Sequence, residues 1–203
     1  MAIKTIFFDI GGVLLTNGFD RHQRQRVLSS LGVDVAEYDA RHEDANYYWE
    51  RGLENVHWYF GQTLFNEPRN FTFDDVWAKV QAEQKLIDNT AMEVLKKLSA
   101  TKRYRLATLN NESRELNAYR LDAFGLREHF DFFICSAYVN EMKPAPKIYR
   151  EAIEVSGRRP EECAFIDDKL ENAEAATQQG MHGIHYTSAE QLEAELRMLG
   201  VVL

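Results

Sequence analysis

Asp9 is a candidate catalytic residue, because it ends a short apolar run at residues 4–9 and is followed by Gly11 and Gly12. Two glycines let the backbone turn sharply and bring its amide groups close to a ligand. A carboxylate in that position could serve as a nucleophile, as a metal ligand or as both. On Asp9 alone, an aspartate that caps the turn after a strand is an equally good interpretation.

An adjacent acidic pair, Asp167 and Asp168, closes a second apolar run at residues 163–168. Neighbouring carboxylates that are partly buried are costly unless a cation compensates their charge. Hard oxygen donors of this kind suit Mg²⁺. The pair therefore indicates a magnesium site rather than a solvated acidic turn, and it favours a chemical role for Asp9 as well.

Lys143 is a candidate partner for these carboxylates. It lies in a loop, since Pro144 and Pro146 predict a helix that begins near Lys147. A fixed ammonium group near a developing phosphoryl charge stabilises that charge electrostatically. In isolation Lys143 reads as an ordinary surface lysine, so its significance depends on the fold bringing it to the acidic side chains.

Five apolar runs rich in β-forming residues would position these side chains. They span residues 4–9, 104–111, 130–136, 163–168 and 183–187. The first, second and fourth runs are followed by stretches of helical character, which is the pattern of βα units in a parallel sheet. We therefore predict an α/β fold with a doubly wound, Rossmann-like parallel sheet.

The predicted sheet would also bring distant polar residues together. In such sheets ligands bind beyond the carboxyl ends of the strands, near the point where the strand order reverses. The polar residues that end the predicted strands are Asp9, Asn110, Asn111, Asp167 and Asp168. We expect these five side chains to form one rim of the sheet.

Residues 17–88 have a different character, being rich in Arg, Glu, Gln, Tyr and Trp. Apolar residues recur in this segment at helical spacing, as at Trp49, Leu53 and Val56. The segment lacks strand-like alternation, and a turn near Pro68 interrupts it. We predict a helical cap inserted after the first strand.

The chain then divides into two predicted domains. Residues 1–16 and 89–203 would form the α/β core, and residues 17–88 would form the cap. Aromatic side chains are dense in the cap, which indicates the packed core of a small domain, or alternatively a ligand pocket or an interface. Ser188 with Gln191 three residues later predicts the start of a closing helix.

Composition excludes several classes of protein. The 203 residues are 45% hydrophobic and 28% charged, which is typical of a folded globular chain. A net charge of −8 disfavours nucleic acid and anionic lipid as partners, and no apolar run approaches the roughly 20 residues that span a bilayer. Cys135 and Cys163 lie in apolar stretches and suit unpaired thiols in a reducing cytoplasm, where we expect the protein to act.

Taken together, these motifs resemble the haloacid dehalogenase-like superfamily, in the subgroup with a helical cap after the first strand. The resemblance runs through four ordered motifs, at residues 7–15, 105–111, 141–149 and 164–181. Four motifs in order are far more specific than any one of them. The most similar branches are the glucose-1-phosphatase-like phosphatases and the N-terminal phosphatase domain of epoxide hydrolases.

The resemblance implies that Asp9 attacks phosphorus to form an aspartyl-phosphate, which water then hydrolyses. Mg²⁺ would be held by the Asp9 carboxylate, the backbone carbonyl of Gly11 and Asp168. Asp167 would contribute directly or through water. Lys143 would hold Asp9 and the phosphoryl group together.

The motif that usually reads Ser or Thr followed by Asn reads Asn110-Asn111 in this chain. An asparagine amide can still donate a hydrogen bond to a phosphoryl oxygen, so we assign that role to Asn110, with Asn111 beside it. Gly11 and Gly12 would approach the substrate through their backbone. Asn172 matches a position that orients the acidic loop.

The family's usual general acid is a second aspartate two residues after the nucleophile, and Gly11 stands there instead. General acid catalysis typically increases the rate by roughly 10² to 10⁴, so substrates with poor leaving groups should be hydrolysed slowly. The glucose-1-phosphatase-like branch resembles this chain in lacking the second aspartate. Asp20, His22 and Glu112 are candidates for a replacement donor, although each also reads as a solvated surface group.

The expected function is Mg²⁺-dependent hydrolysis of a small phosphorylated metabolite such as a sugar phosphate. A haloacid dehalogenase is the main alternative, since those enzymes also lack the second aspartate, but they use no metal and usually carry a large residue at the position of Gly11. A weakly active, ligand-binding or protein-binding family member is the third possibility. The sequence specifies neither the substrate nor the oligomeric state.

Overall fold

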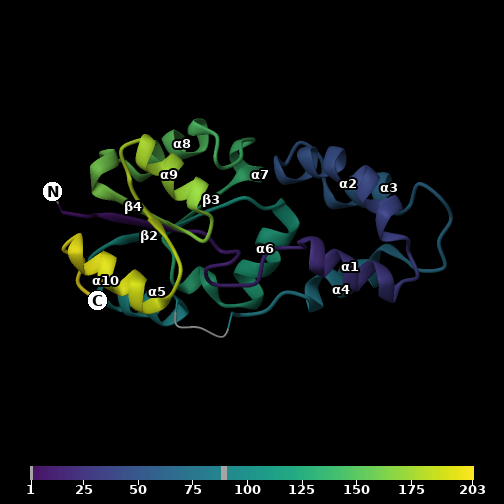
Figure 1. Ribbon diagram of the computed structural model, residues 1–203, viewed down its shortest axis with the longest axis horizontal. Coiled ribbons are helices and arrows are strands. Elements are labelled where there is room, and N and C mark those ends of the chain that lie inside the picture. Colours follow the sequence, from purple (N-terminus) through teal and green to yellow (C-terminus); the bar gives the residue numbers. More distant parts are fainter. Residues whose placement is uncertain (1, 88–90) are drawn as a thin grey trace.

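The computed structural model describes residues 2–87 and 91–203. Within these ranges, five parallel strands form one sheet in the order β3-β2-β1-β4-β5 (Figure 1). The strands are β1 (Thr5–Phe8), β2 (Arg105–Asn110), β3 (Phe132–Cys135), β4 (Cys163–Asp167) and β5 (His182–His185). The first four lie inside predicted runs, and β5 overlaps the fifth run but begins one residue before it, at His182. The predicted doubly wound α/β fold is confirmed.

Helices cover both faces of the sheet. They are α5 (Ala91–Thr101), α6 (Arg114–Ala123), α7 (Ser136–Val139), α8 (Pro146–Ser156), α9 (Leu170–Gln178) and α10 (Ala189–Met198), with short 3-10 turns at Leu126–Glu128 and Pro160–Glu162. Side chains alternate between the faces of a strand. Ile6 and Phe8 of β1 therefore pack with α5 and α10, whereas Phe7 packs with α8 and α9.

Two predicted helix starts are confirmed. The α8 helix begins with Pro146 at its first turn, where the missing N–H of proline costs no hydrogen bond. Ser188 caps α10 and accepts a hydrogen bond from the backbone N–H of Gln191.

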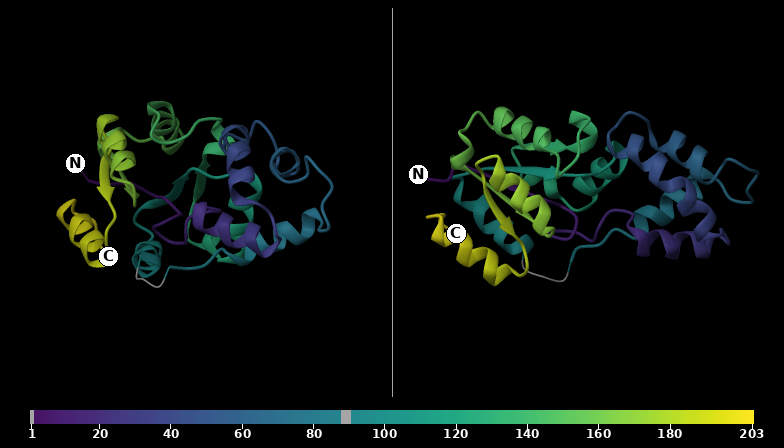
Figure 2. Two further views of the ribbon diagram at one scale, coloured as in Figure 1. Left: turned by 45° about the vertical axis from the view of Figure 1, so that its right-hand side comes forward. Right: turned by 45° about the horizontal axis from the view of Figure 1, so that its top comes forward.

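Of the five helices that the structure describes between β1 and β2, the first four stand apart from the sheet (Figure 2). They are α1 (Arg21–Ser30), α2 (Val35–Glu50), α3 (Val56–Thr63) and α4 (Phe73–Ala82). Their apolar side chains form a cluster of their own, to which α6 adds Leu116. We call these helices the cap. The predicted boundary between residues 88 and 89 lies outside the described residues.

The helical spacing of Trp49, Leu53 and Val56 in the sequence predicted that they share a helix, but in the structure they do not. The α2 helix ends at Glu50 and α3 begins at Val56, while Leu53 lies in the turn between them with half of its surface exposed. Gly52 takes a positive φ of 63° there, a backbone conformation that favours glycine and ends the helical path.

Aromatic residues of the cap divide between interior and surface. Trp49, Tyr59 and Phe60 are buried in the cap cluster, whereas Tyr47 and Tyr48 are exposed. Both cysteines are buried and unpaired, as expected. Across the described residues, no helix combines the length and the apolar character that crossing a bilayer requires.

Candidate active site

Lys143 lies between two carboxylates at the carboxyl ends of β1 and β4. Its Nζ atom is 2.6 Å from Asp167 Oδ2 and 3.1 Å from Asp9 Oδ1. Only 5% of the lysine is exposed. Burial works against the charged ammonium, but Asp9 and Asp167 outweigh that effect and raise the pKa of Lys143 above its ordinary value.

The strand register explains why these acids meet. Phe8 of β1 is paired with Ile166 of β4, so the next residues, Asp9 and Asp167, lie side by side at the carboxyl ends of the two strands. Carboxylate oxygens of Asp9, Asp167 and Asp168 all lie within 4.8 Å of one another. The sheet therefore concentrates three acidic groups at one point.

The crowding of these acids changes the pKa values of Asp9 and Asp168. Burial raises the pKa of Asp9, Lys143 opposes that rise, and Asp167 adds to it. The pKa of Asp168 is raised as well, first by burial and then by its neighbour Asp167. Asp168 Oδ1 is buried and accepts no hydrogen bond from the residues that the structure describes. An orphaned carboxylate oxygen beside two further acids fits a bound cation.

Asp167, in contrast, is well supplied with donors. The Asn172 amide lies 3.0 and 3.1 Å from its two carboxylate oxygens, and the backbone N–H of Lys169 donates to Oδ1 at 2.8 Å. Together with Lys143, these contacts fix the carboxylate in one orientation. Asp167 thus holds the lysine, which leaves Asp168 better placed to offer an oxygen to a metal.

The loop after β1 needs its glycines for space. A Cβ on Gly12, where φ is +74°, would lie 2.2 Å from Asp168 Oδ2. A Cβ on Gly11 would lie 3.0 Å from Asn17 Oδ1. The position where the family usually carries its second aspartate therefore faces the side chain of Asn17.

The two asparagines after β2 play different parts. Asn111 accepts a hydrogen bond from the backbone N–H of Lys143 at 2.8 Å and donates to its carbonyl at 2.9 Å, which anchors the lysine loop. Asn110 is 1% exposed and donates from Nδ2 to Asn117 Oδ1 of α6 at 3.0 Å. The predicted phosphoryl contact of Asn110 stays a prediction, and Asn111 lies on the cavity wall.

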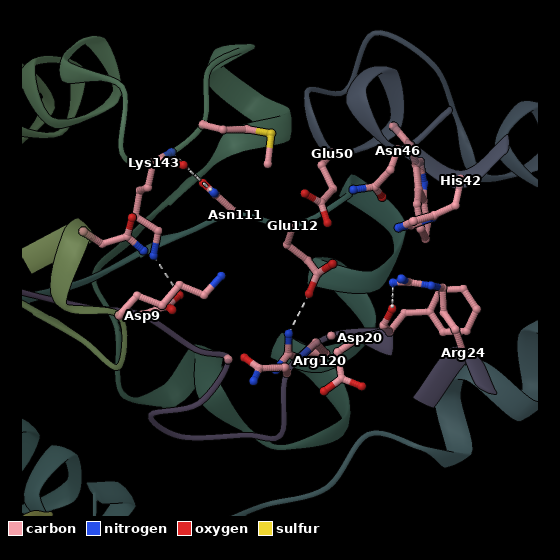
Figure 3. Close-up of a pocket in the computed structure, with 18 residues that line it drawn as sticks. Asp9, Asp20, Arg24, His42, Asn46, Glu50, Asn111, Glu112, Arg120 and Lys143 are labelled. Carbon is pink, nitrogen blue, oxygen red and sulfur yellow. Dashed lines mark hydrogen bonds and ion pairs between the residues drawn. The ribbon is translucent and has the colours of Figure 1, made fainter. Parts of the chain in front are cut away.

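A cavity of about 300 Å³ opens between this rim and the cap (Figure 3). The rim side contributes Asp9, Gly11, Asn17, Asn111, Glu112, Arg120, Met142, Lys143, Lys169 and Asn172. The cap and the segment that leads into α1 contribute Gly18, Phe19, Asp20, Arg24, His42, Asn46, Trp49 and Glu50. The cavity wall is thus built largely from polar side chains.

The sequence did not reveal the polar residues of α2 that line this wall. His42, Asn46 and Glu50 are four residues apart, so one stripe of α2 faces the cavity. That spacing was present in the sequence, but polar residues at helical spacing usually mark a solvated face. Of the candidate proton donors, Asp20 lines the cavity, whereas His22 is exposed on α1.

Glu112, the third candidate donor, is buried in an ion pair. Its Oε2 atom lies 2.6 Å from Arg120 Nη1, and 2–4% of either side chain is exposed. Burial raises the pKa of Glu112, and Arg120 opposes that rise. Arg120 also donates to the carbonyl of Thr16 at 2.6 Å, which ties the loop after β1 to α6.

The class of protein that this fold and site define is a Rossmann-like α/β domain with an acidic cluster and a buried lysine at the rim of its sheet, below an inserted helical cap. The family model of haloacid dehalogenase-like hydrolases matches residues 3–180, and the chain belongs to that family.

Two curated relatives show local similarity. The chain is 32% identical over 80 residues to flavin mononucleotide hydrolase 1 of Arabidopsis thaliana, a match that covers 39% of this chain and 33% of the relative. It is 35% identical over 94 residues to haloacid dehalogenase-like hydrolase domain-containing protein 3 of Mus musculus, covering 46% and 37%. These matches span well under half the length of either relative.

Solved structures share the whole fold. A haloacid dehalogenase family enzyme from Bacteroides thetaiotaomicron has a TM-score of 0.80 at 20% identity, covering 97% of this chain and all of the other. A second structure of that enzyme, in complex with magnesium and inorganic phosphate, has a TM-score of 0.74 at 18% identity, covering 93% and 96%. Likeness at this identity concerns the fold.

Proposed function

We propose that this protein is an Mg²⁺-dependent phosphatase that hydrolyses small phosphorylated metabolites, such as sugar phosphates, through an aspartyl-phosphate on Asp9. The observation that carries the proposal is the position of Lys143 between Asp9 and Asp167, with the orphaned oxygen of Asp168 beside them. A buried cation next to a nucleophilic carboxylate suits the transfer of an anionic phosphoryl group.

The Asp9 carboxylate, the Gly11 carbonyl and Asp168 would hold Mg²⁺, with Asp167 contributing directly or through water. When bound, the metal neutralises charge on the phosphoryl oxygens. Support comes from the acidic cluster of this chain and from the related fold crystallised with magnesium and phosphate. The name of the flavin mononucleotide hydrolase also points to a phosphorylated substrate.

In the proposed reaction, Asp9 bonds to phosphorus as the bond from phosphorus to the ester oxygen breaks and the alcohol leaves, while Lys143 holds both the attacking oxygen and the phosphoryl group. Asn111 keeps the lysine loop in place through its paired backbone hydrogen bonds. The phosphoryl group then passes from Asp9 to water, which restores the carboxylate. Each residue in this scheme is already oriented by contacts within the rim.

The cavity wall supports a hydroxyl-rich substrate. Asn46 and Arg24 offer hydrogen-bond donors, and burial lowers the pKa of His42 to about 4, so its ring is neutral near pH 7. The ring is held by Tyr59, whose hydroxyl lies 2.7 Å from His42 Nδ1. A volume of about 300 Å³ is at the small end of metabolite pockets.

The test is hydrolysis of an activated aryl phosphate by the purified protein, with Mg²⁺ and with excess chelator, beside halide release from 2-chloropropionate. We expect phosphate release that depends on Mg²⁺ and no halide release. Halide release insensitive to chelator would identify a dehalogenase instead. Release of neither phosphate nor halide would favour a weakly active family member that binds a ligand or a protein.

Gly12→Ala should weaken the proposed metal site. The new Cβ would clash with the Asp168 carboxylate, and displaced metal-site partners typically cost 10- to 100-fold in affinity. We expect the Mg²⁺ concentration for half-maximal activity to rise about 10- to 100-fold. Gly157→Ala is the matched control, because Gly157 also has a positive φ but open space around its Cβ position. Equal effects of the two substitutions would contradict the assignment of Asp168.

A further inference from the structure

Among the residues that the structure describes, the carboxyl groups lining the cavity belong to Asp9, Asp20, Glu50 and Glu112. Asp9 is the proposed nucleophile. The Asp20 carboxylate accepts a hydrogen bond from the backbone N–H of Gln23 at 2.8 Å and caps α1. Glu112 is held by Arg120. Three of these four groups therefore already have a role, as nucleophile, helix cap or ion-pair partner.

Glu50, the fourth, is the last residue of α2, and the core fixes its position. Ser136 Oγ donates to the Glu50 carbonyl at 2.6 Å, and Asn140 Nδ2 donates to the Arg51 carbonyl at 2.7 Å. The chain then passes so close to α7 that a Cβ on Gly52 would lie 2.1 Å from a backbone carbonyl oxygen. The end of α2 is thus tied to the rim of the sheet.

The Glu50 side chain points from α2 into the cavity, toward Glu112 (Figure 3). Burial and the charge of Glu112 raise the pKa of Glu50 to about 7. A hydrogen bond from Asn46 of the same helix and the charges of Lys169 and Arg24 act in the opposite direction. Near neutral pH the carboxyl group is therefore present in both protonation states.

Its location suits proton transfer to a leaving group. In-line displacement at phosphorus places the leaving oxygen on the side away from the attacking Asp9. Asp9 lies on the rim side of the cavity and Glu50 on the cap side (Figure 3). A leaving oxygen directed away from Asp9 therefore points toward the wall that carries Glu50.

We propose that Glu50 is the general acid and base of the reaction, supplied by the cap in place of the aspartate that Gly11 replaces; this rests on the proposed function. As Asp9 bonds to phosphorus and the bond to the leaving oxygen breaks, the Glu50 carboxyl group gives its proton to that oxygen, releasing an alcohol. The Glu50 carboxylate then takes a proton from water as the water oxygen bonds to phosphorus. The bond from phosphorus to Asp9 breaks, which returns both side chains to their first state.

The experiment compares Glu50→Gln with the unmodified protein on p-nitrophenyl phosphate, whose leaving group needs no proton, and on glycerol phosphate, whose leaving group does. We expect the first turnover of glycerol phosphate to slow on the order of 10²- to 10³-fold. The first turnover of p-nitrophenyl phosphate should change by less than about tenfold. The exposed Glu43→Gln on the same helix is the control, and it should change neither rate.

The pH profile supplies a second readout. Because an acid must be protonated to donate, kcat/KM for glycerol phosphate should fall as the pH rises above about 7, the pKa of Glu50. This fall in kcat/KM at high pH should be absent in Glu50→Gln and should return in part in Glu50→Asp, which keeps a carboxyl group. Equal slowing of both substrates, or slowing of neither, would overturn the role of Glu50.

These outcomes separate the two proposals. If the unmodified protein hydrolyses neither substrate with Mg²⁺, the phosphatase proposal itself fails. If it hydrolyses both and Glu50→Gln matches it on both, only the role of Glu50 fails. Should Glu50→Gln not fold, the pH profile of Glu50→Asp decides, since a shift in the pH of this fall supports the role and an unchanged fall overturns it.

Discussion

Asp9→Asn should abolish the hydrolysis of every phosphate monoester, with a loss of activity on the order of 10⁴-fold or more. An amide is not a nucleophile toward phosphorus, and it also removes one of the oxygens offered to the metal. The fold should persist, because an amide oxygen can still accept the hydrogen bond that the Ile10 N–H donates to Asp9 Oδ1 at 2.8 Å. Phosphate release with p-nitrophenyl phosphate measures the effect.

Asp44→Asn provides the matched control for that loss. Asp44 is exposed on α2, so the same chemical change there should leave turnover unaltered. Asp9→Asn should also fail to retain radioactive phosphate after an acid quench, whereas the unmodified protein should trap it as the aspartyl-phosphate. A variant that kept normal turnover would show that another group attacks phosphorus.

Lys143→Met should cause the largest loss of stability, about 3–5 kcal/mol in the free energy of unfolding. The buried ammonium holds Asp9 and Asp167 at 3.1 and 2.6 Å. Its removal leaves two buried carboxylates facing each other without that compensating charge. Denaturant unfolding measures the loss, and added Mg²⁺ should recover part of it by binding the folded state.

The loss should also depend on pH. Burial already raises the pKa of Asp9, and Lys143 works against that rise. Without the lysine the pKa of the folded state climbs further above that of the unfolded state, so stability falls as the pH rises between the two values. The variant should therefore be less impaired at about pH 5 than at about pH 8.

Lys96→Met is the control for both effects. Lys96 is half exposed and pairs with Glu93 on the surface of α5, so its loss should alter stability by no more than about 0.5 kcal/mol at either pH. If Lys143→Met were as harmless as Lys96→Met, the two carboxylates would have to be compensated by another group.

Local sequence determined the sheet of this protein and the loops that end its strands. The runs at residues 4–9 and 163–168 are apolar enough to be buried and end abruptly in acids, which is a local signal. Proline at the start of α8 and the Ser188 cap of α10 are local signals too. Periodicity and capping depend on neighbours within a turn or two, so these features could be predicted.

The contacts around Lys143 depend on tertiary structure. Nothing near Lys143 in the sequence shows that it meets Asp9, because that contact follows from the pairing of β1 with β4 and from the anchoring of the lysine loop by Asn111. The same holds for Glu50. In sequence it resembles any solvated glutamate at a helix end, and only the docking of α2 on Ser136 turns it toward the cavity.

The sequence by itself thus determined which strands form and which acids stand at their ends, since burial of apolar runs is decided locally. Tertiary structure decided which distant residues share the cavity, and it broke the helical spacing of Trp49 and Leu53 with a turn at Gly52. The physical reason is that a polar residue at helical spacing looks the same whether it faces water or a cavity. The packing of the cap against the core makes that choice.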